Sequence, residues 1–282
     1  MLRRGRREDA EACDRVCFEA FRAIARAHNF TPDFPSADVA IELMPRLLDH
    51  SSFYPVVAEH DGRIIGSNFL DKRNPIAGVG PLTVDPAFQD KAVGGRLMAD
   101  VHQHARENGF DGVRLLQAAY HNRSLSLYAK LGYDVREPLA CMQGSPFEFA
   151  QGGSTVRPAT ESDIEACNQL CRTIHGYHRD GELRDAVTQG AATVVERDGR
   201  VTGYATTIGF FGHAVGEQND DLQALIGAAT SFVGPGFLLP TRNTDLLRWC
   251  LHQGLRVTQP LTLMSRGAYN DPSGAFLPSI FY

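Results

Sequence analysis

The feature that most constrains how this chain can fold is an internal repeat. The pattern Glu-Ala-Cys-x-x-x-Cys at 11–17 returns 154 residues later at 165–171, and Arg3 and Asp9 return at the same offset as Arg157 and Asp163. Two later features recur in the same order: Val-Val followed by Asp-Gly-Arg at 56–63 and 194–200, and Pro-Leu-x-x-Met at 138–142 and 260–264. A period this long indicates two globular units in tandem rather than a solenoid.

The boundary between the two units is predicted from length and from glycines. A chain of 282 residues suits one or two domains of roughly 150 residues each. The stretch 143–154 contains Gly144, Gly152 and Gly153, which interrupt any helical or strand periodicity. We therefore expect one domain at 1–146 and a second at 155–282.

Local patterns in the first unit predict helices packed on a sheet. Apolar residues from Ala12 to Ile24 recur every three or four positions, which is typical of a helix with one buried face. A loop rich in Pro and Phe at 28–35 precedes a second short helix, expected at 36–48. The stretches 55–59 and 63–70 flank Asp61-Gly62, a strong signal for a β-hairpin. These elements together predict an α+β unit.

Residues 79–132 alternate between strand and helix signals and contain the polar residues that suggest chemistry. A strand at 79–84 leads through a glycine-bearing turn into a helix expected to begin near Arg96; a strand at 113–120 and a helix at 122–130 follow. Such a turn exposes unpaired N–H groups at the positive end of the helix dipole, which form an anion site suited to a pyrophosphate. Lys91 and Arg96 add positive charge there.

This segment resembles the coenzyme A half of the GNAT acetyltransferase superfamily. The resemblance is carried by Val-Asp-Pro-x-x-Gln-x-x-x-x-Gly at 84–94, then His121-Asn122, Tyr128 and Leu-Gly-Tyr at 131–133. It implies an α/β/α fold, with a mixed, mostly antiparallel sheet flanked by helices in each of two tandem domains, and acetyl-CoA as the acyl donor. The cofactor-binding residues that it implies are Leu82, Thr83, Val84, Gln89, Lys91, Ala92, Val93, Gly94, Gly95, Arg96, Asn122 and Tyr128.

The resemblance also implies a mechanism centred on Tyr128. Aminolysis of a thioester needs a neutral amine, a polarised carbonyl and a proton for the departing thiolate. A phenol with a pKa of ~10 is protonated at neutral pH and can supply that proton. Tyr128 is therefore expected to be the general acid. The alternative is a core aromatic residue whose hydroxyl is satisfied elsewhere.

Three residues depart from the family pattern. Ala92 stands where the family has its first glycine, and the carboxylate of Asp90 lies close to the expected anion site. Gly80 stands where many family members carry a glutamate base. The candidates to replace that base are Glu59, His60, Asp71 and His121, although residues of these types in such positions are more often solvated loop residues than bases. A water chain or an amine of low pKa would also serve.

The second unit differs from the first where the chemistry is expected. It has neither a Val-Asp-Pro strand nor a basic glycine turn before its helical segment at 220–236. Asn243 takes the place of Asn122, whereas Trp249 or Cys250 takes the place of Tyr128. We expect this unit to be a degenerate copy that has lost coenzyme binding and either shapes the acceptor pocket or supports the fold.

Composition excludes several partners. A net charge of −5 and a pI near 6.1 argue against nucleic-acid binding, and no apolar run is long enough to span a bilayer. The spacing of the six cysteines matches no metal site, so we expect no metal and free thiols. We also expect a cytoplasmic protein that is a monomer or a homodimer. The apolar segment 270–282 is expected to pack against a domain surface or the domain junction.

The sequence thus predicts an acetyl-CoA-dependent N-acetyltransferase that acts on a primary amine of a small molecule. Two alternatives remain open. One is a non-catalytic acyl-CoA-binding or regulatory module, in which Tyr128 only packs. The other is an acetyltransferase for a protein N-terminus or lysine.

Overall fold

A computed structural model describes residues 1–32, 43–149 and 152–282. The chain divides into two compact units. Unit 1 comprises Met1–Leu115, Tyr120–Tyr133 and Phe281, and unit 2 comprises Leu116–Ala119, Asp134–Ile280 and Tyr282. Residues 116–119 and 134–146, expected in the first domain, group with unit 2, so the assignment of domains to 1–146 and 155–282 stays a prediction.

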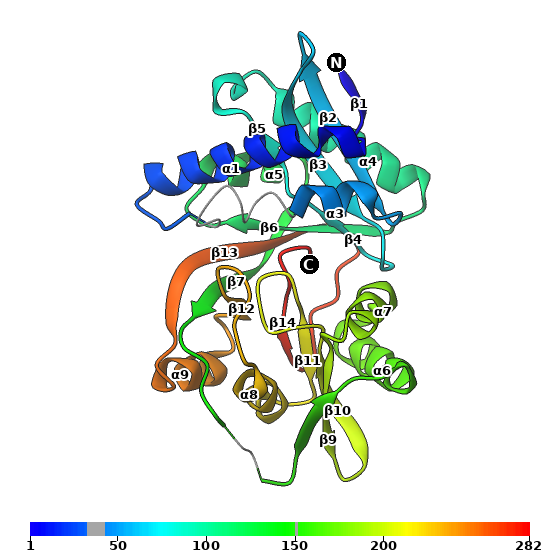
Figure 1. Cartoon of the computed structure of the whole chain (residues 1–282), viewed down its shortest axis with the longest axis vertical. Coiled ribbons are helices and arrows are strands. Elements are labelled where there is room, and N and C mark those ends of the chain that lie inside the picture. Colours follow the sequence, from blue (N-terminus) through cyan, green and yellow to red (C-terminus); the bar gives the residue numbers. More distant parts are fainter. Residues whose placement is uncertain (33–42, 150–151) are drawn as a thin grey trace. The chain divides into compact units, whose positions relative to one another are not determined.

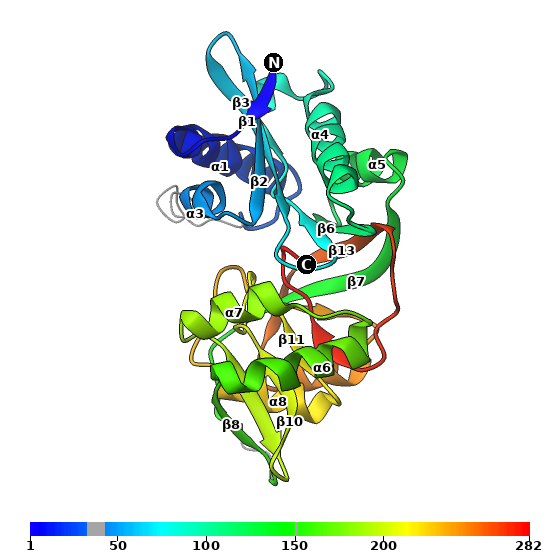
Figure 2. The same ribbon diagram turned by 90° about the vertical axis from the view of Figure 1, so that its right-hand side faces the viewer.

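Unit 1 is a mostly antiparallel sheet with helices on both faces. Its strands follow the order β1-β2-β3-β4-β6, with β5 paired to β3, and only β4 and β6 run parallel. Helices α1 and α3 lie on one face, and α4 and α5 lie on the other (Figure 2). The elements are β1 Leu2–Arg4, α1 Ala10–Ala27, α3 Leu43–Asp49, β2 Phe53–His60, β3 Arg63–Asp71, β4 Ala77–Val79, β5 Thr83–Val84, α4 Val93–Glu107, β6 Gly112–Ala118 and α5 Asn122–Lys130.

Most of the expected elements of unit 1 are confirmed, and two are corrected. The hairpin is β2 and β3, the amphipathic helix is α1, and α5 covers 122–130 as expected. The expected strand at 79–84 is interrupted, because β4 ends at Val79 and β5 begins at Thr83, with Pro81, which has no N–H to donate, between them. Helix α4 begins at Val93 rather than near Arg96. Of the helix expected at 36–48, residues 36–42 lie outside the described part of the chain and the rest is α3.

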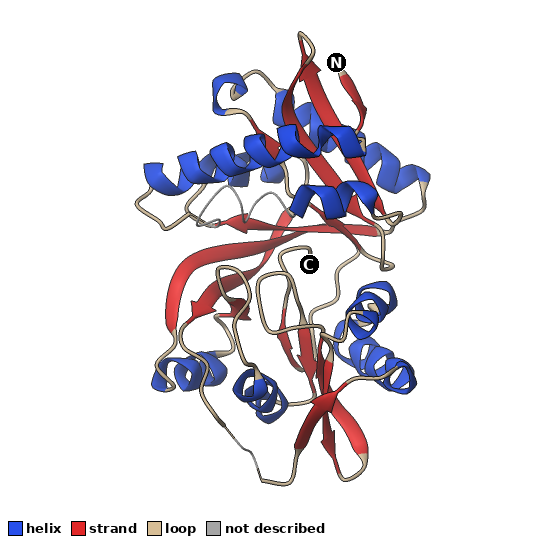
Figure 3. Cartoon of the chain, in the orientation of Figure 1, coloured by secondary structure: helices blue, strands red, loops and turns tan. Residues whose placement is uncertain are grey.

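Unit 2 contains one five-stranded antiparallel sheet and three further strands. Strands β14, β11, β10, β9 and β8 form the sheet in that order, with α6 and α7 on one face and α8 on the other (Figures 1 and 3). Of the further strands, β7 pairs antiparallel with both β12 and β13. The elements are β7 Asp134–Gln143, β8 Thr155–Pro158, α6 Ile164–His175, α7 Asp180–Thr188, β9 Thr193–Arg197, β10 Arg200–Ala205, β11 Ala214–Gly216, α8 Asn219–Ala228, β12 Phe237–Pro240, α9 Thr244–His252, β13 Arg256–Gly267 and β14 Ala275–Leu277.

The internal repeat appears in three dimensions as one ion-pair motif built twice. In unit 1, both terminal nitrogens of Arg3 bond the carboxylate of Asp9 at 2.7 Å, and its Nε bonds Glu59 at 2.8 Å. In unit 2, Arg157 bonds Asp163 at 2.8 Å through both terminal nitrogens and bonds Glu196 at 2.9 Å. Each arginine thereby joins the first strand, the start of the first helix and the hairpin. The expected fold, two tandem α/β/α copies, is confirmed.

Apolar burial explains both the cysteines and the C-terminal segment. All six cysteines are buried free thiols, and Cys13 and Cys17 pack in the core of unit 1 with Phe69. Near the C-terminal end, β14 pairs with β11, and the ring of Phe281 lies edge-on to Phe53 with centroids 5.9 Å apart. The segment therefore packs against other residues, as its composition predicts.

Candidate functional site

The turn before α4 leaves a helix N-terminus open. Ala92 is the N-cap residue, with φ of 59°, and its methyl group cannot accept a hydrogen bond from the first turn of the helix. No acidic residue lies in that turn, and the Nζ of Lys91 lies 4.7 Å from the centre of the Phe88 ring. Uncapped helix starts flanked by cations are suited to binding anions, and the assignment of this turn as a phosphate site stays a prediction.

The carboxylate of Asp90 is offset by a residue that the sequence analysis missed. Asp90 forms an exposed ion pair with Arg123, in the first turn of α5. The pairing moderates the repulsion that Asp90 would exert on a bound phosphate, and it adds a cation beside the turn. Because the partners lie 33 residues apart, no local spacing in the sequence could have identified them.

The strand expected to meet the cofactor backbone has one open edge. Thr83 and Val84 of β5 pair with Ser67 and Gly66 of β3, and no other described strand pairs with β5. An unpaired strand edge presents N–H and C=O groups to a ligand. Leu82 precedes this edge, and the side chain of Gln89 donates to the carbonyl of Val84 at 3.3 Å.

Tyr128 and Asn122 lie on α5, and each is available for a different task. The side chain of Asn122 is exposed and makes no hydrogen bond to any described residue. Tyr128 is only 9% exposed, its hydroxyl bonds no described residue, and burial raises the pKa of its phenol. Tyr128 is therefore protonated at neutral pH, as a proton donor must be.

The structure separates the four candidate bases. Glu59 is held by Arg3, Asp71 is held by Arg73 at 2.6 Å, and His60, the last residue of β2, lies 3.4 Å from Asp61. His121 differs from these three, because it precedes Asn122 directly and is half-buried. Burial, followed by the charges of Arg123 and His28, lowers the pKa of His121, so that its imidazole is neutral at pH 7 and could accept a proton.

An aromatic pair borders His121. The rings of Phe30 and Tyr120 stack with centroids 4.1 Å apart and planes 12° apart, and His28 lies 5.5 Å from Tyr120. Phe30 belongs to the loop rich in Pro and Phe that follows α1, while Tyr120 precedes α5. Sequence reasoning singled out the loop for its Phe and Pro content but missed its contact with Tyr120.

The second copy has no equivalent anion site. Helix α8, which takes the place of α4, begins with a capping box in which the carboxylate of Asp221 accepts from the N–H of Gln218 at 3.0 Å. Asp220 and Asp221 place two negative charges in its first turn, where a phosphate would be repelled. In α9, Asn243 pairs its amide with Asn219 and caps its own helix at the N–H of Leu246.

The described residues contain neither a cluster of metal ligands nor a membrane-spanning helix. Within the described residues, no three His, Cys, Asp or Glu side chains gather closely enough to hold a metal ion. None of the described helices has both the length and the hydrophobicity that crossing a bilayer requires.

Both units have helices on either face of a sheet, and the first has an open helix start. Residues 18–133 match the family model described as the acetyltransferase (GNAT) family. The match covers less than half of the chain, so it shows that this segment is similar to the family. A comparison with curated proteins gave no match.

Solved structures support the same fold over the whole chain. A Pyrococcus horikoshii protein assigned as an acetyltransferase aligns with a TM-score of 0.74 at 14% identity, covering 98% of this chain and 93% of that one. A GCN5-related N-acetyltransferase from Sphaerobacter thermophilus gives 0.62 at 16% identity, with 98% of both chains covered. A tandem GNAT protein from the clavulanic acid biosynthesis pathway gives 0.57 at 12%, covering 96% and 99%. At these identities the likeness concerns the fold alone.

Proposed function

We propose that this protein is an acetyl-CoA-dependent N-acetyltransferase whose acceptor is a primary amine of a small molecule. The observation that carries the proposal is that one unit holds the open, uncapped start of α4, the exposed amide of Asn122 and the buried, protonated phenol of Tyr128. An anion site, an amide and a proton donor within one unit are the three groups that a thioester cofactor with a pyrophosphate requires.

Residues of unit 1 would hold the cofactor as follows. The N–H groups at Val93, Gly94 and Gly95, with Lys91 and Arg96, would bind the pyrophosphate, and the open edge of β5 would pair with the pantetheine amides. Bound acetyl-CoA would supply an activated acetyl thioester. Gln89 and Ala92 contribute to the turn, and Asn122 would hydrogen-bond the cofactor arm.

Proton transfer is assigned to two side chains of unit 1. Tyr128 would donate a proton to the departing sulfur, because burial keeps its phenol protonated. His121 would accept a proton from the attacking amine, because its lowered pKa keeps it neutral at pH 7 and it follows Tyr120, whose ring stacks on Phe30. Glu59, His60 and Asp71 are less suitable, because each already has a charged partner.

The decisive experiment combines calorimetric titration of acetyl-CoA with a thiol-release assay over a panel of small amines. We expect one binding site per chain and turnover that falls about 100-fold in Tyr128→Phe with acetyl-CoA affinity unchanged. Tyr133→Phe is the matched control: it removes a neighbouring phenol that bonds His102 at 2.8 Å. Binding without turnover for any small amine would support the module alternative, and turnover only with peptides would support a protein acceptor.

A further inference from the structure

The equivalent strands β4 of unit 1 and β11 of unit 2 have different neighbours. In unit 1, β4 pairs with β6 at Ala77 and Gly78. In unit 2, β11 pairs along its full length with the C-terminal strand β14, from Ala214 with Leu277 to Gly216 with Ala275. The three residues of β14 are buried. A ligand that pairs with the backbone is thus excluded from β11, and the capping box of α8 occupies the N–H groups that would bind a pyrophosphate.

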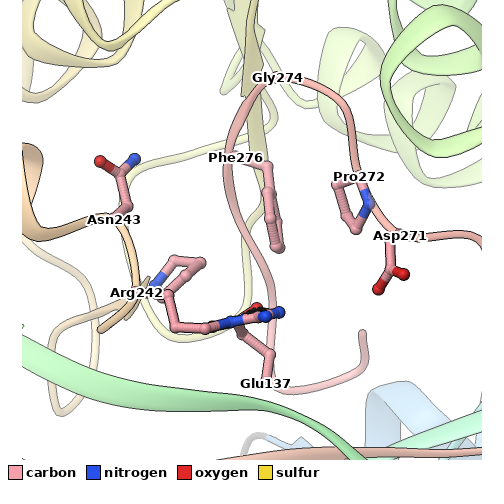
Figure 4. A pocket seen from close by; sticks show the side chains of 8 residues that line it. Glu137, Arg242, Asn243, Asp271, Pro272, Gly274 and Phe276 are labelled. Carbon is pink, nitrogen blue, oxygen red and sulfur yellow. Dashed lines mark hydrogen bonds and ion pairs between the residues drawn. The ribbon is translucent and has the colours of Figure 1, made fainter.

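A pocket of ≈390 Å³ lies beside β14 (Figure 4). Arg242 and Asn243 at the joint of β12 and α9 line one side, and Asp271 and Pro272 of the loop before β14 line another. The ring of Phe276 and the carboxylate of Glu137 also line it, together with Pro240 and Gly274. This volume is at the lower end of small-molecule sites and suits a ligand of modest size.

Arg242 is fixed in this pocket by a buried carboxylate. Its Nε lies 3.0 and 3.1 Å from the two oxygens of Glu137, and its Nη2 bonds the same group at 2.5 Å. The Glu137 side chain is 4% exposed, while Arg242 is 64% exposed. The remaining nitrogen, Nη1, bonds no residue in the described part of the chain. A guanidinium held in this way has free donors to offer to a carboxylate at little entropic cost.

A second charge of opposite sign lies across the pocket. The carboxylate of Asp271 makes no hydrogen bond or ion pair with any described residue and lies on the side of the pocket away from Asn243 (Figure 4). The rings of Phe276 and Pro272 provide an apolar surface on one side of the gap between the two charged groups (Figure 4). We propose that this pocket binds a small zwitterion, with its carboxylate on Arg242 and its ammonium group on Asp271.

Calorimetric titration with probes of defined charge tests the proposal. Glycine, β-alanine and 4-aminobutyrate carry both charges, whereas acetate and ethylamine carry one each. We expect at least one zwitterion to bind about tenfold or more tightly than either single-charge probe. Fluorescence of Trp249, the only tryptophan in the sequence, should respond, because it lies on α9, whose N-terminus borders the pocket.

Three variants assign the charges. Asp271→Asn, on an exposed loop, should reduce the affinity for the zwitterion to that for acetate. Glu137→Gln combined with Arg242→Gln removes the guanidinium without leaving a buried charge unpaired, and should reduce it to that for ethylamine. The matched control is Arg248→Gln, an exposed arginine of α9 paired with Asp245, which should change nothing. Equal affinities for all probes, an Asp271→Asn variant that binds normally, or no saturable binding up to about 10 mM would overturn the proposal.

Discussion

Comparing the two copies of the repeat leads to a prediction about Asp14, a buried carboxyl group of unit 1. It lies on α1, is 3% exposed, and accepts one long hydrogen bond from the N–H of Met44 at 3.4 Å; its second oxygen has no partner among the described residues. At the same repeat offset, unit 2 carries Asn168, whose amide donates to Asp180 at 2.7 Å. The second copy therefore places a neutral side chain where the first buries a carboxyl group. We expect Asp14→Asn to stabilise the protein.

The magnitude follows from the pKa of this carboxyl group. Burial raises the pKa of Asp14 from 3.8 to about 6, against the weaker effect of the Met44 hydrogen bond. The folded state thus binds the proton more tightly than the unfolded state, so the free energy of unfolding falls as pH rises from about 4 to about 6 and is constant above that. Two pKa units correspond to about 3 kcal/mol, which solvent screening reduces to roughly 1–2 kcal/mol.

Urea denaturation followed by circular dichroism at pH 4 and pH 8 measures this effect. The free energy of unfolding of Asp14→Asn should exceed that of the unchanged protein by roughly 1–2 kcal/mol at pH 8 and by almost nothing at pH 4. The reciprocal change Asn168→Asp should destabilise at pH 8, because it would oppose the carboxylate of Asp180. A gain of equal size at both pH values would refute the argument, since it would show that packing rather than charge is responsible.

Two further predictions concern the candidate site. Ala92→Gly should raise the free energy of unfolding, measured in a thermal or urea melt, by about 1 kcal/mol, because Ala92 has a left-handed φ of 59°. The control is Ala99→Gly, at an exposed position inside α4, which should lower the free energy of unfolding by a similar amount. If both glycines destabilise, the backbone argument for Ala92 is wrong. His121→Gln should lower kcat/KM and remove the acid limb that we expect below pH 6.5, the side to which the pKa of His121 is lowered. The exposed His60→Gln should retain that limb; its loss there, or its persistence in His121→Gln, would exclude His121 as the base.

Local patterns were sufficient to predict the frame of each unit. Helix α5 was predicted at its observed ends because a polar residue precedes its apolar positions and glycine follows them. The hairpin was predicted because Asp61 and Gly62 take the positive φ angles that its turn needs. The repeated Arg3 and Arg157 were visible as sequence matches, although their shared bonding pattern was not. In each case the information lies within a few residues or in the repeat itself.

Contacts between distant residues could not be predicted in this way. Asp90 meets Arg123, and β14 meets β11, only after the chain has folded. The same is true of a buried group in unit 2, where Glu182 bonds Arg179 at 2.5 Å and lies 3.2 Å from His213. A buried carboxylate is tolerated there because two basic side chains share it, and no periodic pattern reports such a pairing.

The comparison of the two copies separates residues that build the fold from residues that bind. Asp9 and Asp163 both accept paired hydrogen bonds from an arginine that lower their pKa, so both contribute stability at neutral pH that is lost as the pH falls through the lowered pKa of each group. The starts of the corresponding helices α4 and α8, by contrast, differ between the two copies. In α4 the start is uncapped and flanked by Lys91, whereas in α8 a capping box and two aspartates close it. A helix start without its cap forgoes about 1 kcal/mol, and the ligand proposed for α4 would supply the missing hydrogen bonds.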